Sequence, residues 1–116
     1  MPARVLVVED SAPVRGLIVT ILERAGYQVT AAADVGSALE AAGDLSTSDL
    51  VICDVYLGGQ SGIGLGEELR ANRPGLRVLY VSGQTIHPPL SDGSGFLLKP
   101  FRPEALVAKV KELTGR

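Results

Sequence analysis

Short, uninterrupted apolar runs alternate with helix-like segments along this chain, and this alternation restricts the fold more than any other feature. The strongest runs are Arg4 to Val8, Leu50 to Cys53 and Arg77 to Val81, and weaker ones are Gln28 to Ala32 and Phe96 to Leu98. Continuous apolar runs of this length are typical of strands buried on both faces. Their alternation with helices predicts a parallel sheet that is covered on both sides.

The segment after the first run has the clearest helical pattern. Ser11 is a suitable N-cap, Pro13 suits the first turn, and Gly26 suits a left-handed C-cap. Apolar residues then recur at helical spacing, which predicts one buried stripe. The stripe consists of Val14, Leu17, Ile18, Ile21 and Leu22.

Three further helices are expected. The first covers about Ser37 to Ala42. The second follows the glycine-rich loop Leu57 to Gly62 and extends to roughly Arg73, and the third covers Pro103 to Leu113. Right-handed crossovers between parallel strands leave few topologies open. We therefore predict an α/β, flavodoxin-like, doubly wound fold with five parallel strands in the order 2-1-3-4-5.

The size and charge of the chain restrict its class. Its 116 residues fit a single domain over 1–116, and we expect no output domain. A net charge of −2 gives no electrostatic footprint for nucleic acid or an anionic membrane. No apolar stretch is long enough to span a bilayer, and Cys53 has no cysteine partner. These features predict a cytoplasmic protein.

Charged and hydroxyl side chains stand where the expected strands end. They are, in chain order, Glu9, Asp10, Asp54, Ser82 and Lys99. Because the carboxyl ends of parallel strands share one edge of a sheet, we expect these residues to meet there. Crowded carboxylates repel one another unless a cation lies among them, and oxygen ligands favour Mg²⁺, with Mn²⁺ as the alternative. Together these groups supply what phosphoryl transfer uses.

This set, in this order over essentially the whole chain, resembles the signature of the response-regulator receiver family of two-component signalling. The likeness extends to the Lys99-Pro100-Phe101 sequence. It implies a stand-alone phosphoacceptor that is not an enzyme but assists its own phosphorylation and dephosphorylation. The donor would be a histidine kinase or phosphotransfer protein. The output would be a changed surface that binds an unknown protein target.

The resemblance also implies a role for each metal-binding residue. Asp54 would be the phosphoacceptor and a metal ligand, and Asp10 would bind Mg²⁺ directly. Glu9 would bind the ion through water, and the backbone carbonyl of Tyr56 would complete the protein's share. Tyr56 also lies where the family tunes hydrolysis, and we hypothesise that its ring shields the acyl phosphate.

The remaining roles concern the phosphoryl group and the response to it. Lys99 would pair with the phosphoryl group, and its bond to Pro100 would be cis. Ser82 would turn to hydrogen-bond the phosphoryl oxygens. Phe96 occupies the family's aromatic switch position, three residues before the lysine, although core packing alone would also explain it.

Two segments depart from the family pattern. Gly58 stands where the family usually has proline, so we expect a looser loop that is not reorganised. The segment from Gly83 to Gly95 contains two prolines and three glycines, where the family fits a full helix. We expect that fourth helix to be short or missing.

The sequence does not match the motifs of several enzyme classes that act on similar folds or on phosphate. Haloacid-dehalogenase phosphatases need Asp-x-Asp, but Asp54 is followed two residues later by Tyr56. The chain contains no Gly-x-Ser-x-Gly elbow and no Gly-Lys-Ser/Thr phosphate loop. A phosphorelay shuttle, a phosphate sink and a phosphorylation-independent interaction module stay open as alternatives.

Overall fold

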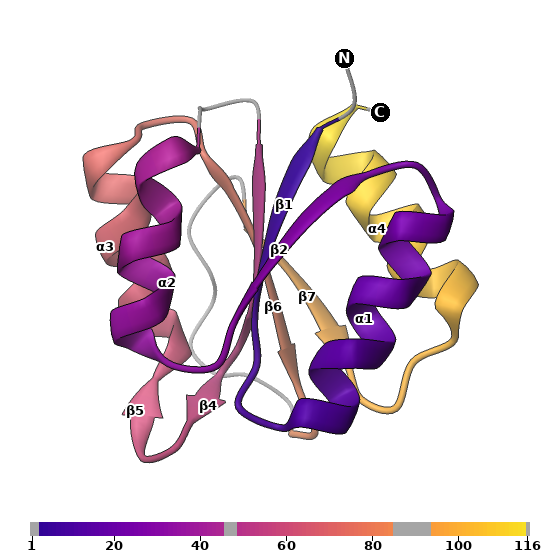
Figure 1. The fold of residues 1–116 in the computed structure, drawn as a ribbon, viewed down its shortest axis with the longest axis horizontal. Coiled ribbons are helices and arrows are strands. Elements are labelled where there is room, and N and C mark those ends of the chain that lie inside the picture. Colours follow the sequence, from indigo (N-terminus) through magenta and orange to yellow (C-terminus); the bar gives the residue numbers. More distant parts are fainter. Residues whose placement is uncertain (1–2, 46–48, 85–93, 116) are drawn as a thin grey trace.

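Five parallel strands form the central sheet of the computed structural model, which describes residues 3–45, 49–84 and 94–115 (Figure 1). In spatial order they are β2 (Gln28–Ala32), β1 (Arg4–Val8), β3 (Leu50–Asp54), β6 (Arg77–Ser82) and β7 (Ser94–Leu98). This arrangement confirms the predicted order, with β6 and β7 as the fourth and fifth strands. β3 is buried along its whole length, as its continuous apolar sequence requires.

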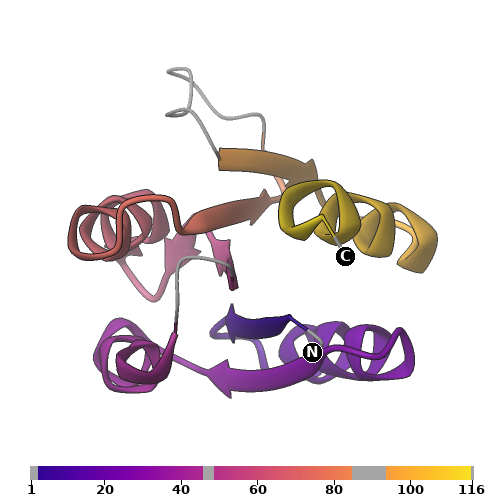
Figure 2. The same ribbon diagram turned by 90° about the horizontal axis from the view of Figure 1, so that it is seen from above.

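The helices lie in two layers, one on each face of the sheet (Figure 2). They are α1 (Ala12–Arg24), α2 (Val35–Ala41, extended by a 3-10 turn at Ala42–Asp44), α3 (Gly62–Asn72) and α4 (Pro103–Thr114). α1 and α4 cover one face, and α2 and α3 cover the other (Figure 1). Each face has its own apolar core, because successive residues of a buried strand point to opposite sides.

α1 differs from its sequence pattern in two respects. Ser11 is the N-cap residue, but its side chain makes no capping hydrogen bond. Its backbone nitrogen instead donates to Glu9 Oε2 at 3.2 Å. Ile18 and Leu22 are fully buried as expected, whereas Leu17 is 56% exposed. The expected stripe is therefore wider than the face that the sheet covers.

The segment after Asp54 is more ordered than the loose loop expected from Gly58. Two short antiparallel strands, β4 (Tyr56–Leu57) and β5 (Gln60–Ser61), form a hairpin there. Gly58 and Gly59 both have positive φ, at 54° and 90°. Adjacent positive φ angles match the twist of a two-residue hairpin turn, so glycine replaces proline here with a defined geometry.

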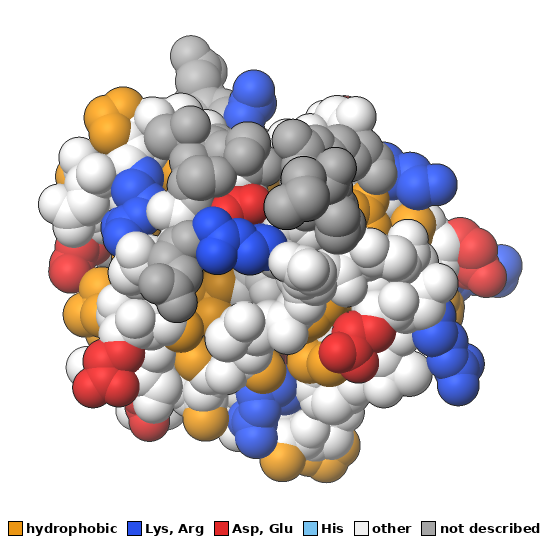
Figure 3. Space-filling model, turned by 45° about the horizontal axis from the view of Figure 1, so that its top comes forward, with side chains coloured by type: hydrophobic (Ala, Val, Ile, Leu, Met, Phe, Trp, Pro, Cys, Tyr) orange, Lys and Arg blue, Asp and Glu red, His pale blue; other side chains and the backbone are white. Residues whose placement is uncertain are grey.

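The expectation of a short or missing fourth helix concerns residues 85–93, which lie outside the described residues. Within the described ranges, no helix is long and apolar enough to cross a membrane. Basic and acidic side chains are interspersed on the face shown in Figure 3 and do not form a patch of one sign.

At the amino ends of β1 and β3, Arg4 pairs with the buried Asp49 through its guanidinium and its backbone nitrogen.

Two glycines of α3 face different surroundings. A Cβ at Gly66 would overlap the hydroxyl and ring edge of Tyr80, which is fully buried and donates to the Ile63 carbonyl at 3.4 Å. A Cβ at Gly64 would meet only Ser61 at ordinary van der Waals distance. Gly66 is thus required by packing, whereas Gly64 only weakens the helix.

We predict opposite effects of alanine at these two positions. Gly64→Ala should raise the free energy of unfolding by up to about 1 kcal/mol, because alanine favours the helix. Gly66→Ala should lower it by about 1–3 kcal/mol, because the buried tyrosine ring cannot move aside. Urea unfolding of the two variants measures both effects. Equal changes in the two variants would contradict the close packing of α3 on Tyr80.

Candidate functional site

The carboxyl edge of the sheet brings together side chains from three strands. Glu9 follows β1, Asp54 ends β3, and Lys99 follows β7. Lys99 Nζ donates to Glu9 Oε1 at 2.6 Å and to Asp54 Oδ2 at 2.8 Å. Glu9 and Asp54 are both buried, so the ammonium group compensates two carboxylates that are largely removed from water.

This environment acts differently on the ionisable groups. Burial raises the pKa of Glu9, although the hydrogen bond from Lys99 opposes it. Burial also acts to raise the pKa of Asp54, but hydrogen bonds from Lys99 and the Tyr56 backbone outweigh it and hold that pKa below its ordinary value. Burial lowers the pKa of Lys99, but the two carboxylates more than offset this and raise it. Asp54 is therefore ionised at neutral pH.

Asp10 completes a candidate metal site. Carboxylate oxygens of Glu9, Asp10 and Asp54 all lie within 4.8 Å of one another, and Asp10 is exposed to solvent. The donor set consists of hard oxygen atoms, with no histidine or cysteine in the cluster. Such a set fits Mg²⁺ or Mn²⁺, and an exposed member leaves room for the water ligands that Mg²⁺ usually retains.

Two loops meet beside Asp54. The Tyr56 backbone nitrogen donates to Asp54 Oδ1 at 3.0 Å, and the exposed Tyr56 hydroxyl donates to Gln84 Oε1 at 3.3 Å. The Gln84 backbone nitrogen donates to the buried Ser82 Oγ at 3.0 Å. Gln84 thus connects two predicted site residues. The sequence reasoning missed it, although its place just after a strand end was an available signal.

Arg15 is the second residue that the sequence reasoning missed. From the second turn of α1, its guanidinium donates to the backbone carbonyl of Glu9 at 2.8 Å. A basic residue one turn after the acidic pair was the available signal. Arg15 therefore helps to fix the position of the β1 end and the acids that follow it.

The other predicted residues lie near this edge in different settings. The Lys99–Pro100 bond is cis, as expected. Phe96 is partly buried, in register with Tyr80 of β6, and packs on the α2–α3 core. Cys53 is buried, and burial with the nearby carboxylates raises its thiol pKa to about 12. The thiol is thus a core group. A Cβ at Gly62 would overlap the Asp54 carbonyl, so glycine is required there.

The fold and this edge define a doubly wound α/β domain with an acidic site beside a lysine. The family model described as "Response regulator receiver domain" matches residues 5–111. The chain therefore belongs to the response-regulator receiver family of two-component systems. Receiver domains are in general non-enzymatic signalling modules that bind Mg²⁺ at an acidic pocket and interact with histidine kinases or phosphotransfer proteins.

Sequence relatives and solved structures agree with this assignment. The chain is 32% identical to the probable transcriptional regulatory protein TcrX of Mycobacterium tuberculosis, over 99% of this chain and 51% of TcrX. It is 33% identical to the DNA-binding response regulator MtrA of Mycobacterium leprae, over 96% of this chain and 51% of MtrA. The chain thus spans about half the length of these relatives.

Two receiver structures are similar over nearly their whole length. The CheY-like receiver domain protein of Methanospirillum hungatei has a TM-score of 0.85 and 27% identity, covering 99% of this chain and 95% of that one. The receiver domain of the hybrid histidine kinase CckA has a TM-score of 0.83 and 33% identity, covering 97% and 99%. The fold is therefore that of a receiver domain.

We predict that Lys99 and a divalent cation substitute for each other electrostatically. Lys99→Met should lower the free energy of unfolding by about 3 kcal/mol at neutral pH, because two buried carboxylates lose their counter-charge. Mg²⁺ should then raise the melting temperature of this variant more than that of the wild-type chain. Calorimetry with and without Mg²⁺ measures both effects.

Lys109→Met is the matched control. It removes an exposed ion pair with Glu112, which contributes little to stability. The control should keep the wild-type response to Mg²⁺. Equal responses in Lys99→Met and the wild-type chain would contradict a cation site among these acids.

Proposed function

We propose that this receiver domain accepts a phosphoryl group on Asp54 in an Mg²⁺-dependent reaction and signals through a changed protein-binding surface. The observation that carries the proposal is the convergence of one ammonium group on an ionised, buried Asp54, with Glu9 and Asp10 beside it. A carboxylate held as an anion next to a fixed cation is prepared for attack on phosphorus.

The proposed reaction is a transfer between two side chains. A carboxylate oxygen of Asp54 attacks the phosphorus of a phosphohistidine on a histidine kinase or phosphotransfer protein. The P–N bond breaks as the P–O bond forms, and the histidine leaves with its electron pair and takes up a proton. A Mg²⁺ ion held by Asp10, Asp54, the Tyr56 carbonyl and, through water, Glu9 would neutralise charge on the phosphoryl oxygens.

The response starts from the groups next to the acceptor. The phosphoryl group adds negative charge and strong hydrogen-bond acceptors. Lys99 would pair with it. Ser82, whose Oγ now accepts from the Gln84 backbone nitrogen, would turn to donate its hydroxyl proton to a phosphoryl oxygen, which would change the contacts of Gln84. Phe96, on the neighbouring strand β7, would repack in response. The stand-alone organisation and the cytoplasmic location stay predictions.

Acetyl phosphate tests the acceptor chemistry without a kinase. We expect the Mg²⁺-loaded chain to gain the mass of one phosphoryl group, and Asp54→Asn to gain none. Asp34→Asn is the matched control, because asparagine caps a helix about as well as the aspartate that now caps α2. Intact-mass spectrometry gives the result. Modification of Asp54→Asn, or of the wild-type chain in excess chelator, would contradict the proposal.

Tyr56 should set the lifetime of the acyl phosphate. Its ring is on the hairpin beside Asp54, and its hydroxyl is tied to Gln84. We expect Tyr56→Ala to speed dephosphorylation by roughly 2–10-fold, because water gains access, a barrier change of about 0.4–1.4 kcal/mol. Tyr56→Phe keeps the ring and should stay closer to the wild-type rate. Release of phosphate from the purified acyl phosphate measures the rates, and an unchanged rate in Tyr56→Ala would remove the shielding role.

A further inference from the structure

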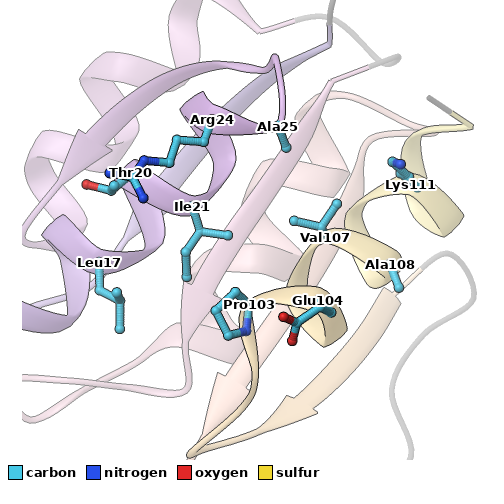
Figure 4. Close-up of a pocket in the computed structure, with 10 residues that line it drawn as sticks. All are labelled: Leu17, Thr20, Ile21, Arg24, Ala25, Pro103, Glu104, Val107, Ala108 and Lys111. Atoms are coloured by element: carbon cyan, nitrogen blue, oxygen red, sulfur yellow. The ribbon is translucent and has the colours of Figure 1, made fainter.

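A groove with mostly apolar walls runs between α1 and α4 and encloses about 640 Å³ (Figure 4). Leu17 and Ile21 of α1 line one side, and Pro103 and Val107 of α4 line the other. Leu17 is exposed, with 56% of its surface open to solvent. Both helices follow strands from the same sheet edge, so they run in the same direction.

The two ends of the groove differ in shape. Leu17 and Pro103 lie at the end where both helices begin, and Leu17 projects outward there (Figure 4). Ala25 lies at the opposite end, and the small Ala108 lies further along α4 from Pro103. The groove thus carries the projecting Leu17 at one end, and the small Ala25, with Arg24 and Lys111 nearby, at the other.

The two ends also differ in charge. Glu104 is in the first turn of α4 and Lys111 is in its last turn, and both line the groove. They are seven residues apart, about two helical turns, so they lie on one face of the helix. Neither forms an ion pair with any residue in the described part of the chain. Each charge is available to a partner.

We propose that a second copy of this chain docks on this groove through a two-fold axis that crosses α1 beside Ile21. Leu17 and Ala25 are each four residues from Ile21, so the rotation places Leu17 over Ala25 of the partner subunit. The same rotation places Glu104 opposite the partner subunit's Lys111, on either side of the Val107–Ala108 step. A single two-fold rotation therefore pairs complementary shapes and opposite charges, as a self-complementary interface requires.

The dimensions of this surface predict a weak dimer. Helices of 13 and 12 residues are each about 20 Å long, so a pair of them offers an interface at the small end of the known range. The burial of Leu17 supplies the attraction. The two symmetry-related Glu104–Lys111 pairs mainly set the orientation, because exposed ion pairs contribute little affinity.

Sedimentation equilibrium of the full chain over a wide concentration range tests the proposal. The wild-type mass should rise from 12.1 kDa towards twice that value. Leu17→Asp should stay monomeric, whereas Leu39→Asp, which alters an exposed leucine of α2 on the other face of the sheet, should associate like the wild-type chain. A wild-type chain that is monomeric throughout, or a dimer that Leu17→Asp leaves intact, would overturn the proposal.

Charge reversal tests the two-fold arrangement itself. Glu104→Lys and Lys111→Glu should each weaken association roughly tenfold, because each creates two like-charged contacts per dimer. An equimolar mixture of the two variants should associate again, since both contacts of the mixed dimer then join opposite charges. Unchanged melting temperatures would show that both variants are folded. A mixture that associates no better than either variant alone would overturn this arrangement.

Discussion

The ammonium group of Lys99 joins the ends of three strands, and the geometry of the site depends on this interaction. It bonds to Glu9 after β1 and to Asp54 at the end of β3, at 2.6 and 2.8 Å. Without it, two buried carboxylates would face each other, which is costly in a medium of low dielectric constant. The same cation helps to keep Asp54 ionised, so the interaction that stabilises the edge would also prepare Asp54 for the proposed reaction.

Contacts of Gly62, Tyr56 and Gln84 connect this site to the neighbouring helix and loops. Gly62 lets α3 approach the Asp54 carbonyl, and the hairpin after Asp54 holds the Tyr56 backbone nitrogen against the Asp54 carboxylate. Gln84 contacts both the Tyr56 hydroxyl and the Ser82 side chain. A charge added at Asp54 would therefore act directly on the hairpin, through the Tyr56 backbone nitrogen, and indirectly on Gln84, through the Tyr56 hydroxyl. The α1–α4 groove has its own shape and charge, so association there is a separate property of the fold.

The strand order and the meeting of Glu9, Asp54 and Lys99 at one sheet edge followed from the sequence because both depend on local patterns. Short buried strands are continuous apolar runs, and the topology then brings their ends to one edge. The exposed side chain of Leu17 could not be predicted, because helical spacing does not tell how wide a face the sheet covers. The hairpin and the Gln84 contacts were missed for a similar reason. They depend on φ angles and loop geometry that single residues do not reveal.

The most direct test of the central claim is the chemical location of the phosphoryl group. Borohydride reduces an acyl phosphate of aspartate to homoserine, and tandem mass spectrometry of the digested chain then identifies the residue. After incubation with Mg²⁺ and a phosphoryl donor, we predict homoserine at position 54 alone. Reduction at Asp10, or none in a chain that has gained a phosphoryl group, would contradict the assignment of Asp54 as the acceptor.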